Sequence, residues 1–218
     1  MTMKALLLFA AGSLAAQQLV VDRAAPRGGT PAGQKLEAGV KGFLGDSFRI
    51  GAKGETWMID SIRVWVVPDQ SPRCAKQPGD RYSQIVLLGA LDNPPVPGEP
   101  TCDCHAMTAI STAPLTRGTA VSPNRSFTLT PAEGAWQLDF HNLRWSLPGG
   151  MDVIFSVRAT GVPKAACGSA DSLALSVSPA ASGYRLHTFD TKAVPIGLAE
   201  PASEPRWINV QVWAHPVQ

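Results

Sequence analysis

Residues 136–158, WQLDFHNLRWSLPGGMDVIFSVR, alternate apolar and polar side chains over three consecutive runs. Successive side chains of a β-strand point to opposite faces of the sheet, so a period of two predicts strands with one buried face. The alternation slips by one residue at positions 141–142, as a bulge or corner would produce, and residues 56–67 show the same slip at positions 60–61. Positions 148–150 predict a tight turn. The side chains expected to be buried together are Trp136, Leu138, Phe140, Val153, Phe155 and Val157.

The composition favours an all-β chain. Its 218 residues include 20 Gly and 19 Pro, and only 17% of the residues are charged. Many turn formers and few charges are typical of a turn-rich sheet protein. Further short strands are expected at 18–22, 47–50, 56–67, 82–88, 126–130, 172–177, 183–189 and 207–213. We predict an antiparallel β-sandwich, jelly-roll-like, with about nine or ten strands.

The start of the chain predicts export. Lys4 precedes an apolar run at residues 5–11, and small residues follow at 13, 15 and 16, so we expect a signal peptide over residues 1–16. The alternative is a short buried helix. Residues 17–41 are expected to hold a strand and a Pro/Gly-rich linker, and residues 42–218 a single β-sandwich domain. The apolar run is too short to cross a bilayer, so we expect a secreted or periplasmic protein without a membrane span after processing.

The cysteine content can be interpreted in the light of the expected export. The chain has four cysteines: Cys74, Cys102, Cys104 and Cys167. In an oxidising compartment an even number of cysteines predicts disulfides, and four allow three pairings. A bond between Cys102 and Cys104 would close a very small, strained ring, so each is expected to pair elsewhere. The alternative is a metal site, because Cys102, Cys104 and His105 offer thiolate and imidazole ligands for Cu(I) or Zn(II).

The sequence Gly45-Asp46-Ser47 is similar to the nucleophile block of the GDS-type esterases, in which the serine attacks an acyl carbon. Such a serine needs a positioned base, which that family supplies from a late Asp-x-x-His, and none of the four histidines here follows that pattern. Alternation places Phe48 and Ile50 inward and Ser47 on the opposite, solvated face. We expect no catalytic residue, and an esterase is the less favoured alternative.

Three of the six tryptophans are candidates for ligand binding: Trp65, Trp145 and Trp213. Trp65 and Trp213 have the opposite parity to their apolar neighbours, which predicts the outer face of a sheet. Exposed indole rings stack on the apolar faces of sugars while polar neighbours fix the orientation. The alternative for each tryptophan is a packing role.

Two stretches resemble exported bacterial β-sandwich domains of the kind found in secreted, PEP-CTERM-like proteins. In residues 46–65 an acidic-aromatic strand and a turn lead into Trp-x-Ile-Asp-x-Ile, and in residues 136–157 a strand ends in Leu-Pro-Gly before another strand. The resemblance covers about a third of the chain. It implies the fold and export but no reaction, because such domains mostly have no assigned activity.

These observations predict an exported, non-catalytic β-sandwich protein with a binding or extracellular assembly role. The alternative is a carbohydrate-binding module that acts through outer-face tryptophans. We expect no cofactor, and the partners expected are an extracellular polysaccharide or other surface proteins. A net charge of +2 without a cluster of Lys or Arg argues against nucleic acid.

Overall fold

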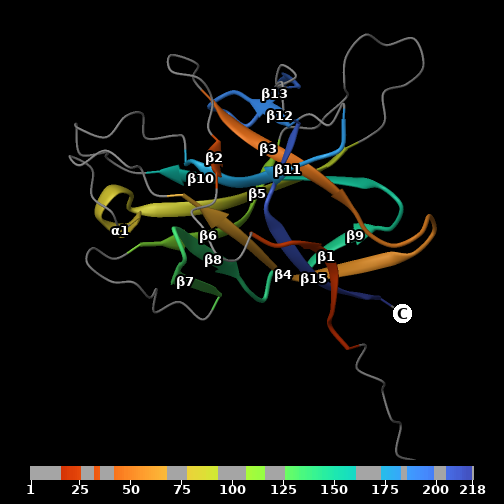
Figure 1. Ribbon diagram of the computed structural model, residues 1–218. Coiled ribbons are helices and arrows are strands. Elements are labelled where there is room, and N and C mark those ends of the chain that lie inside the picture. The colour runs from red at the N-terminus through yellow and green to blue at the C-terminus, as the bar shows by residue number, and fades with distance from the viewer. Residues whose placement is uncertain are drawn as a thin grey trace, which may run out of the picture.

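A computed structural model gives the fold (Figure 1). It describes residues 16–25, 32–34, 42–67, 78–92, 107–115, 126–160, 173–182, 186–198 and 205–217. Within these ranges the chain is all-β, with two antiparallel sheets and one four-residue helix, α1 (Pro78–Arg81). That helix is too short to cross a membrane, and no other helix occurs in the described ranges.

The larger sheet has nine strands, and its long central strand β4 (Thr56–Val66) pairs with several others. One edge of β4 pairs with β15, which in turn pairs with β1, and the other edge pairs with β8 and β9. The remaining members of this sheet are β1 (Gln18–Arg23), β2 (Ala32–Gln34), β7 (Phe127–Ala132), β8 (Ala135–Phe140), β9 (Trp145–Pro148), β11 (Leu175–Pro179), β14 (Arg206–Ile208) and β15 (Val210–Pro216).

The smaller sheet has six strands in the order β13-β12-β3-β10-β5-β6. Its longest pairing joins β10 to β5 along nine residues of each strand. Both edge strands contain a proline, which removes a ladder donor and discourages pairing with another chain. The strands are β3 (Phe43–Arg49), β5 (Gln84–Asp92), β6 (Thr108–Pro114), β10 (Asp152–Thr160), β12 (His187–Phe189) and β13 (Pro195–Leu198).

The two sheets enclose one main hydrophobic core, which gives a sandwich-like arrangement. Alternate residues of β4, β8 and β15 reach it from the larger sheet, and alternate residues of β3, β5 and β10 reach it from the smaller one. Phe140 and Phe155 are both fully buried in it. A second, smaller apolar cluster lies on the outer face of the six-stranded sheet, where Phe43 and Phe189 stack with ring centroids 5.5 Å apart.

The two slips in the alternation coincide in space. Residues 141–144 separate β8 from β9, with positive φ at Asn142 (55°) and Arg144 (51°). The partner strand β4 has its own slip beside Asp60, whose carbonyl oxygen accepts a hydrogen bond of 3.0 Å from the Leu143 amide. The pairing of β15 with β4 also shifts at this level. The expected strand, bend, strand, turn and strand are therefore confirmed, and the bend belongs to a line of irregularities across three strands.

Five of the six side chains expected to be buried together are buried. Trp136 is half-buried and packs against the edge of the core. The described residues contain more strands than expected, because several are only three or four residues long and too short to show alternation. The strand β6 lies in a region for which the sequence indicated no element. Residues 1–15 of the expected signal peptide lie outside the described residues, as does most of the expected linker.

Candidate functional site

The glycine of the Gly45-Asp46-Ser47 motif has a packing role in β3. A Cβ atom at Gly45 would lie 2.8 Å from the carbonyl oxygen of Phe155 and 2.8 Å from the ring of Phe189. No side chain fits there, because the backbone of β10 and a ring on the outer face already fill the space. The glycine is therefore explained without reference to catalysis.

Asp46 is a junction between the two sheets. Its side chain is fully buried, and Oδ2 accepts hydrogen bonds from the Ile208 amide at 2.7 Å and from Arg23 Nη1 at 3.2 Å. Oδ1 accepts a bond of 2.7 Å from the Ser47 amide, and Arg23 Nη2 donates to the Ser47 carbonyl oxygen at 2.9 Å. A buried carboxylate is tolerated only when it is paired and hydrogen-bonded. The Asp46 contacts thus fix β1 and β14 of one sheet against β3 of the other.

Ser47 is half-buried on the face of β3 opposite to the buried Phe48 and Ile50, as the alternation predicts. Among the described histidines, His187 is the nearest to it in register. It lies opposite Gly45 on β12, and its ring centroid lies 6.3 Å from that of Phe189.

The other two described histidines belong to the nine-stranded sheet. His215 Nδ1 lies 2.7 Å from Asp60 Oδ2, and His141 Nε2 lies 3.4 Å from Thr128 Oγ1. Both rings are therefore engaged with partners of their own sheet, away from β3.

The three candidate tryptophans lie in different surroundings. Trp65 faces outward between Val64 and Val66 but is only 7% exposed. Trp145 packs against the main core, and its ring occupies the space that a side chain at Gly89 would need. Trp213 alternates with the buried Val212 and Ala214 and is half-buried on the outer face of the nine-stranded sheet. Trp213 is thus the one of the three that combines the outer face with partial exposure.

Beside Trp213, polar side chains form a row across four adjacent strands, which we term the polar ladder. Its members are Asp22 on β1, Gln211 on β15, Arg63 on β4, and Gln137 and Asp139 on β8. Asp22, Gln211, Arg63 and Asp139 are direct register partners. Gln211, Arg63 and Asp139 alternate with buried core residues, so the row lies on the outer face.

Hydrogen bonds run the length of the polar ladder. Gln211 Nε2 donates to Asp22 Oδ1 at 2.8 Å, and Arg63 Nη1 donates to Gln211 Oε1 at 3.2 Å. Arg63 Nε donates to Asp139 Oδ1, and Gln137 Nε2 donates to Asp139 Oδ2 at 2.7 Å. These bonds fix the orientation of each planar group before any ligand arrives.

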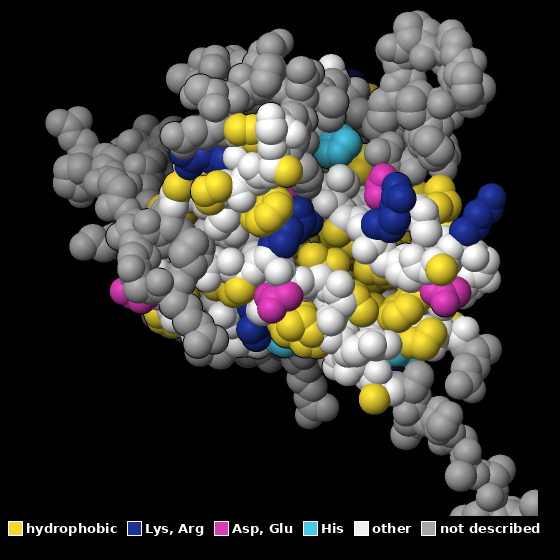
Figure 2. Space-filling view, turned by 45° about the vertical axis from the view of Figure 1, so that its right-hand side comes forward, with side chains coloured by type: hydrophobic (Ala, Val, Ile, Leu, Met, Phe, Trp, Pro, Cys, Tyr) yellow, Lys and Arg dark blue, Asp and Glu magenta, His cyan; other side chains and the backbone are white. Residues whose placement is uncertain are grey.

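The guanidinium of Arg63 also lies over the Trp213 ring, 5.0 Å from its centroid. Its side chain is 30% exposed, whereas that of Asp139 is 8% exposed. Figure 2 shows basic and acidic side chains interspersed among hydrophobic ones on the visible face. The ladder therefore offers fixed donors and acceptors next to an aromatic ring, an arrangement suited to binding a neutral polar ligand.

The cysteine and metal predictions fall outside the described residues. Cys74, Cys102, Cys104, His105 and Cys167 all lie in ranges that the structure does not describe. Within the ranges it does describe, no group of three or more His, Cys, Asp or Glu side chains is placed to hold a metal ion.

No protein-family model, curated protein or solved structure matches this chain.

Proposed function

We propose that the chain is an exported, non-catalytic, jelly-roll-like β-sandwich protein whose role is binding or assembly in the secreted or periplasmic space. The observation that carries this proposal is the polar ladder on the outer face of the nine-stranded sheet. Export is supported by the basic and apolar start of the sequence. The likeness to exported bacterial β-sandwich domains points the same way.

The ladder supports binding because its side chains are ordered and partly exposed. A ligand that meets Arg63, Gln211 and Asp22 finds their planar groups already fixed by one another. Ordering a rotamer-rich side chain on binding costs roughly 0.5–1.5 kcal/mol, so fixed side chains retain more of the interaction energy as affinity. The Gly45-Asp46-Ser47 motif, in contrast, supports a structural interpretation, since Gly45 and Asp46 each serve packing between strands.

Carbohydrate binding is the second candidate function, and Trp213 is the observation that favours it. An indole ring beside planar hydrogen-bonding groups suits a pyranose, which presents an apolar face and a rim of hydroxyl groups. The ligand class would then be a neutral or weakly charged extracellular polysaccharide.

A photo-crosslinking amino acid tests the ladder as a binding surface. Asp22 is the exposed end of the ladder, and Lys192 is an exposed control position in the turn before β13. We expect the exported protein to crosslink to one defined partner from position 22 and not from position 192. Equal yields at the two positions, or no product from position 22, would contradict the proposal.

Calorimetry against a panel of soluble polysaccharides separates the two candidate functions. In the carbohydrate interpretation, Trp213→Ala weakens binding at least about tenfold, since stacking on an aromatic ring is lost. Trp207→Ala is the matched control, because Trp207 also lies beneath an arginine, with Arg23 5.8 Å from its ring centroid, but stands outside the ladder. Binding that survives Trp213→Ala unchanged argues against the carbohydrate interpretation.

A further inference from the structure

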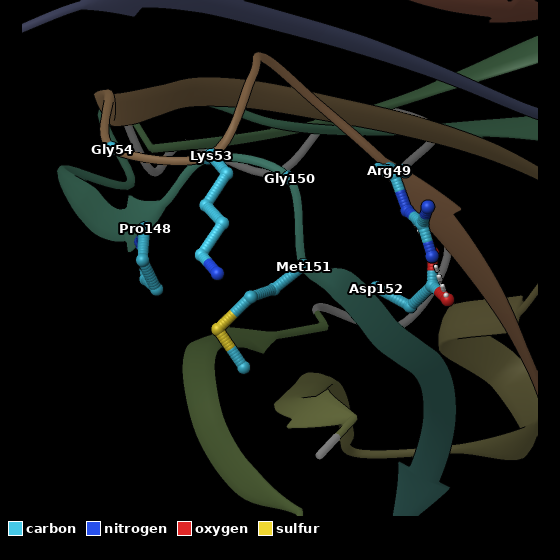
Figure 3. A pocket seen from close by; sticks show the side chains of 8 residues that line it. Arg49, Lys53, Gly54, Pro148, Gly150, Met151 and Asp152 are labelled. Carbon is cyan, nitrogen blue, oxygen red and sulfur yellow. Dashed lines mark hydrogen bonds and ion pairs between the residues drawn. The ribbon is translucent and has the colours of Figure 1, made fainter. Parts of the chain in front are cut away.

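A second candidate site lies at one end of the two sheets, away from the polar ladder. A hollow of about 490 Å³ opens between the turn that joins β3 to β4 and the turn that joins β9 to β10. Figure 3 shows the Lys53 side chain extending into it between Pro148 and Met151. Arg49 and Asp152 form the opposite rim. The volume falls within the range of small-molecule sites, roughly 300–1,000 Å³.

Backbone hydrogen bonds join the two turns that form this hollow. The Gly149 amide donates to the Glu55 carbonyl oxygen, and the Gly150 amide donates to the Ile50 carbonyl oxygen, both at 2.9 Å. A Cβ atom at Gly150, where φ is 77°, would lie 2.7 Å from the backbone nitrogen of Lys53, so the two turns meet backbone to backbone. The position of the two turns relative to one another is therefore fixed by direct backbone contacts.

Both acidic side chains near Lys53 are already engaged. Asp152 accepts two hydrogen bonds from Arg49, at 2.8 Å to Oδ1 and 2.7 Å to Oδ2. Those bonds and the charge of Asp152 raise the pKa of the Arg49 guanidinium. Glu55 Oε2 accepts from the Ala52 amide at 2.7 Å and from the Trp57 indole at 2.9 Å, and these bonds lower the pKa of Glu55.

The Lys53 ammonium is left without such a partner. Among the described residues it makes no hydrogen bond or ion pair. The surface around it is chiefly apolar and includes Pro148 and Met151. One uncompensated positive charge beside an apolar wall favours a ligand with one negative group and an apolar body.

We propose that this hollow binds an organic monocarboxylate with an apolar body, its carboxylate on Lys53 and its body against Pro148 and Met151. A carboxylate accepts charge-assisted hydrogen bonds from an ammonium, and the apolar body removes hydrocarbon surface from water. The hollow shares no residue with the polar ladder, so this proposal does not depend on whether the ladder binds a ligand.

The test is a titration of the full exported chain with benzoate, followed by NMR of ¹³C-labelled methionine methyl groups. Met151 lines the hollow, so its methyl group reports on binding there. Met107 is 5% exposed and belongs to the second apolar cluster, so the Met107 methyl group serves as an internal reference. We expect benzoate to shift the Met151 methyl signal, assigned by its loss in Met151→Leu, and to leave the Met107 signal unchanged.

Two comparisons identify the role of the charge. Lys53→Gln and the replacement of benzoate by its neutral isostere benzamide should each weaken binding about tenfold, as expected for the loss of one charge-assisted contact. Lys192→Gln removes another exposed lysine, one that makes no ion pair with any residue the structure describes, and should leave the affinity unchanged. The proposal is overturned if benzoate does not move the Met151 signal, or if Lys53→Gln binds benzoate as tightly as the unmodified chain does.

Discussion

At the scale of single residues, the Gly45-Asp46-Ser47 motif shows how a sequence that resembles a catalytic block can have a structural origin. The three positions differ in what they contact: a ring and a carbonyl oxygen at Gly45, an arginine and two amides at Asp46, and a half-buried outer face at Ser47. The sequence predicted the orientation of Ser47 from its parity. The same parity places Asp46 inward with Phe48, but the sequence could not predict what pairs with its carboxylate, because Arg23 lies 23 positions earlier and on the other sheet.

Removing the cation from the Asp46 junction should destabilise the fold. Arg23→Met leaves a fully buried carboxylate without its ion pair, which we expect to cost about 3–5 kcal/mol of unfolding free energy in urea titrations. Arg49→Met is the matched control, because the pair of Arg49 with Asp152 is exposed and should contribute little. Equal losses for the two variants would show that burial of Asp46 is not what matters.

Ser47→Ala should leave both fold and function unchanged. Without a base to remove its proton, the hydroxyl is a poor nucleophile near neutral pH. His187 on the adjacent strand is the one described histidine close to Ser47 in register, so it is the base that the test must exclude. Turnover of short-chain aryl esters by the unmodified chain, Ser47→Ala and His187→Ala is the measurement. Hydrolysis that disappears in both variants would establish an enzyme and refute the non-catalytic proposal.

At the scale of elements, the alternation predicted β4, β8 and β10 well, because each has one face in the main core. It also located both slips in the alternation. It failed for β6, where Thr108–Pro114 mixes small and polar side chains that carry little periodicity. It placed Trp213 on the outer face and Trp145 on the same face as Leu147, and both placements agree with the structure. It gave no sign that the Trp145 ring sits where β5 of the facing sheet has Gly89.

The polar ladder could be predicted only in part. Parity alone places Arg63, Asp139 and Gln211 on outer faces, and the charges of Arg63 and Asp139 are opposite. What joins them is the register of β15, β4 and β8, which depends on packing of distant strands and on the slip beside Asp60. The hollow at Lys53 had no sequence signal, because two turns far apart in the chain create it.

The pairing of β10 between β3 and β5 makes Phe155 a central core residue of the smaller sheet. Its ring is fully buried and lies 5.6 Å from that of Phe48. Phe155→Ala should cost about 3–5 kcal/mol of unfolding free energy, through lost transfer energy plus a cavity. Val194→Ala, at a side chain 42% exposed, is the control and should change little. A loss for Phe155→Ala no larger than the control's would mean that this strand register is wrong.

At the scale of the whole molecule, two sheets share one main core, and a second apolar cluster covers part of the outer face of the smaller sheet. Among the described strands, no backbone ladder joins one sheet to the other, and side-chain packing and the Asp46 junction connect them. Long-range contacts dominate the described chain, as expected for an antiparallel fold whose partners are distant in sequence. Such a fold gains from covalent links that restrict the unfolded chain.

The cysteines supply the whole-molecule prediction. If Cys74, Cys102, Cys104 and Cys167 form two disulfides after export, each bond should add roughly 2–4 kcal/mol by restricting the unfolded chain. We expect mass spectrometry of the exported protein under denaturing, non-reducing conditions to find no cysteine that alkylates. Prior reduction is the control and should expose all four, and peptide mapping would then distinguish the three pairings. Two cysteines that alkylate without reduction would contradict the disulfide prediction and favour the metal site at Cys102, Cys104 and His105.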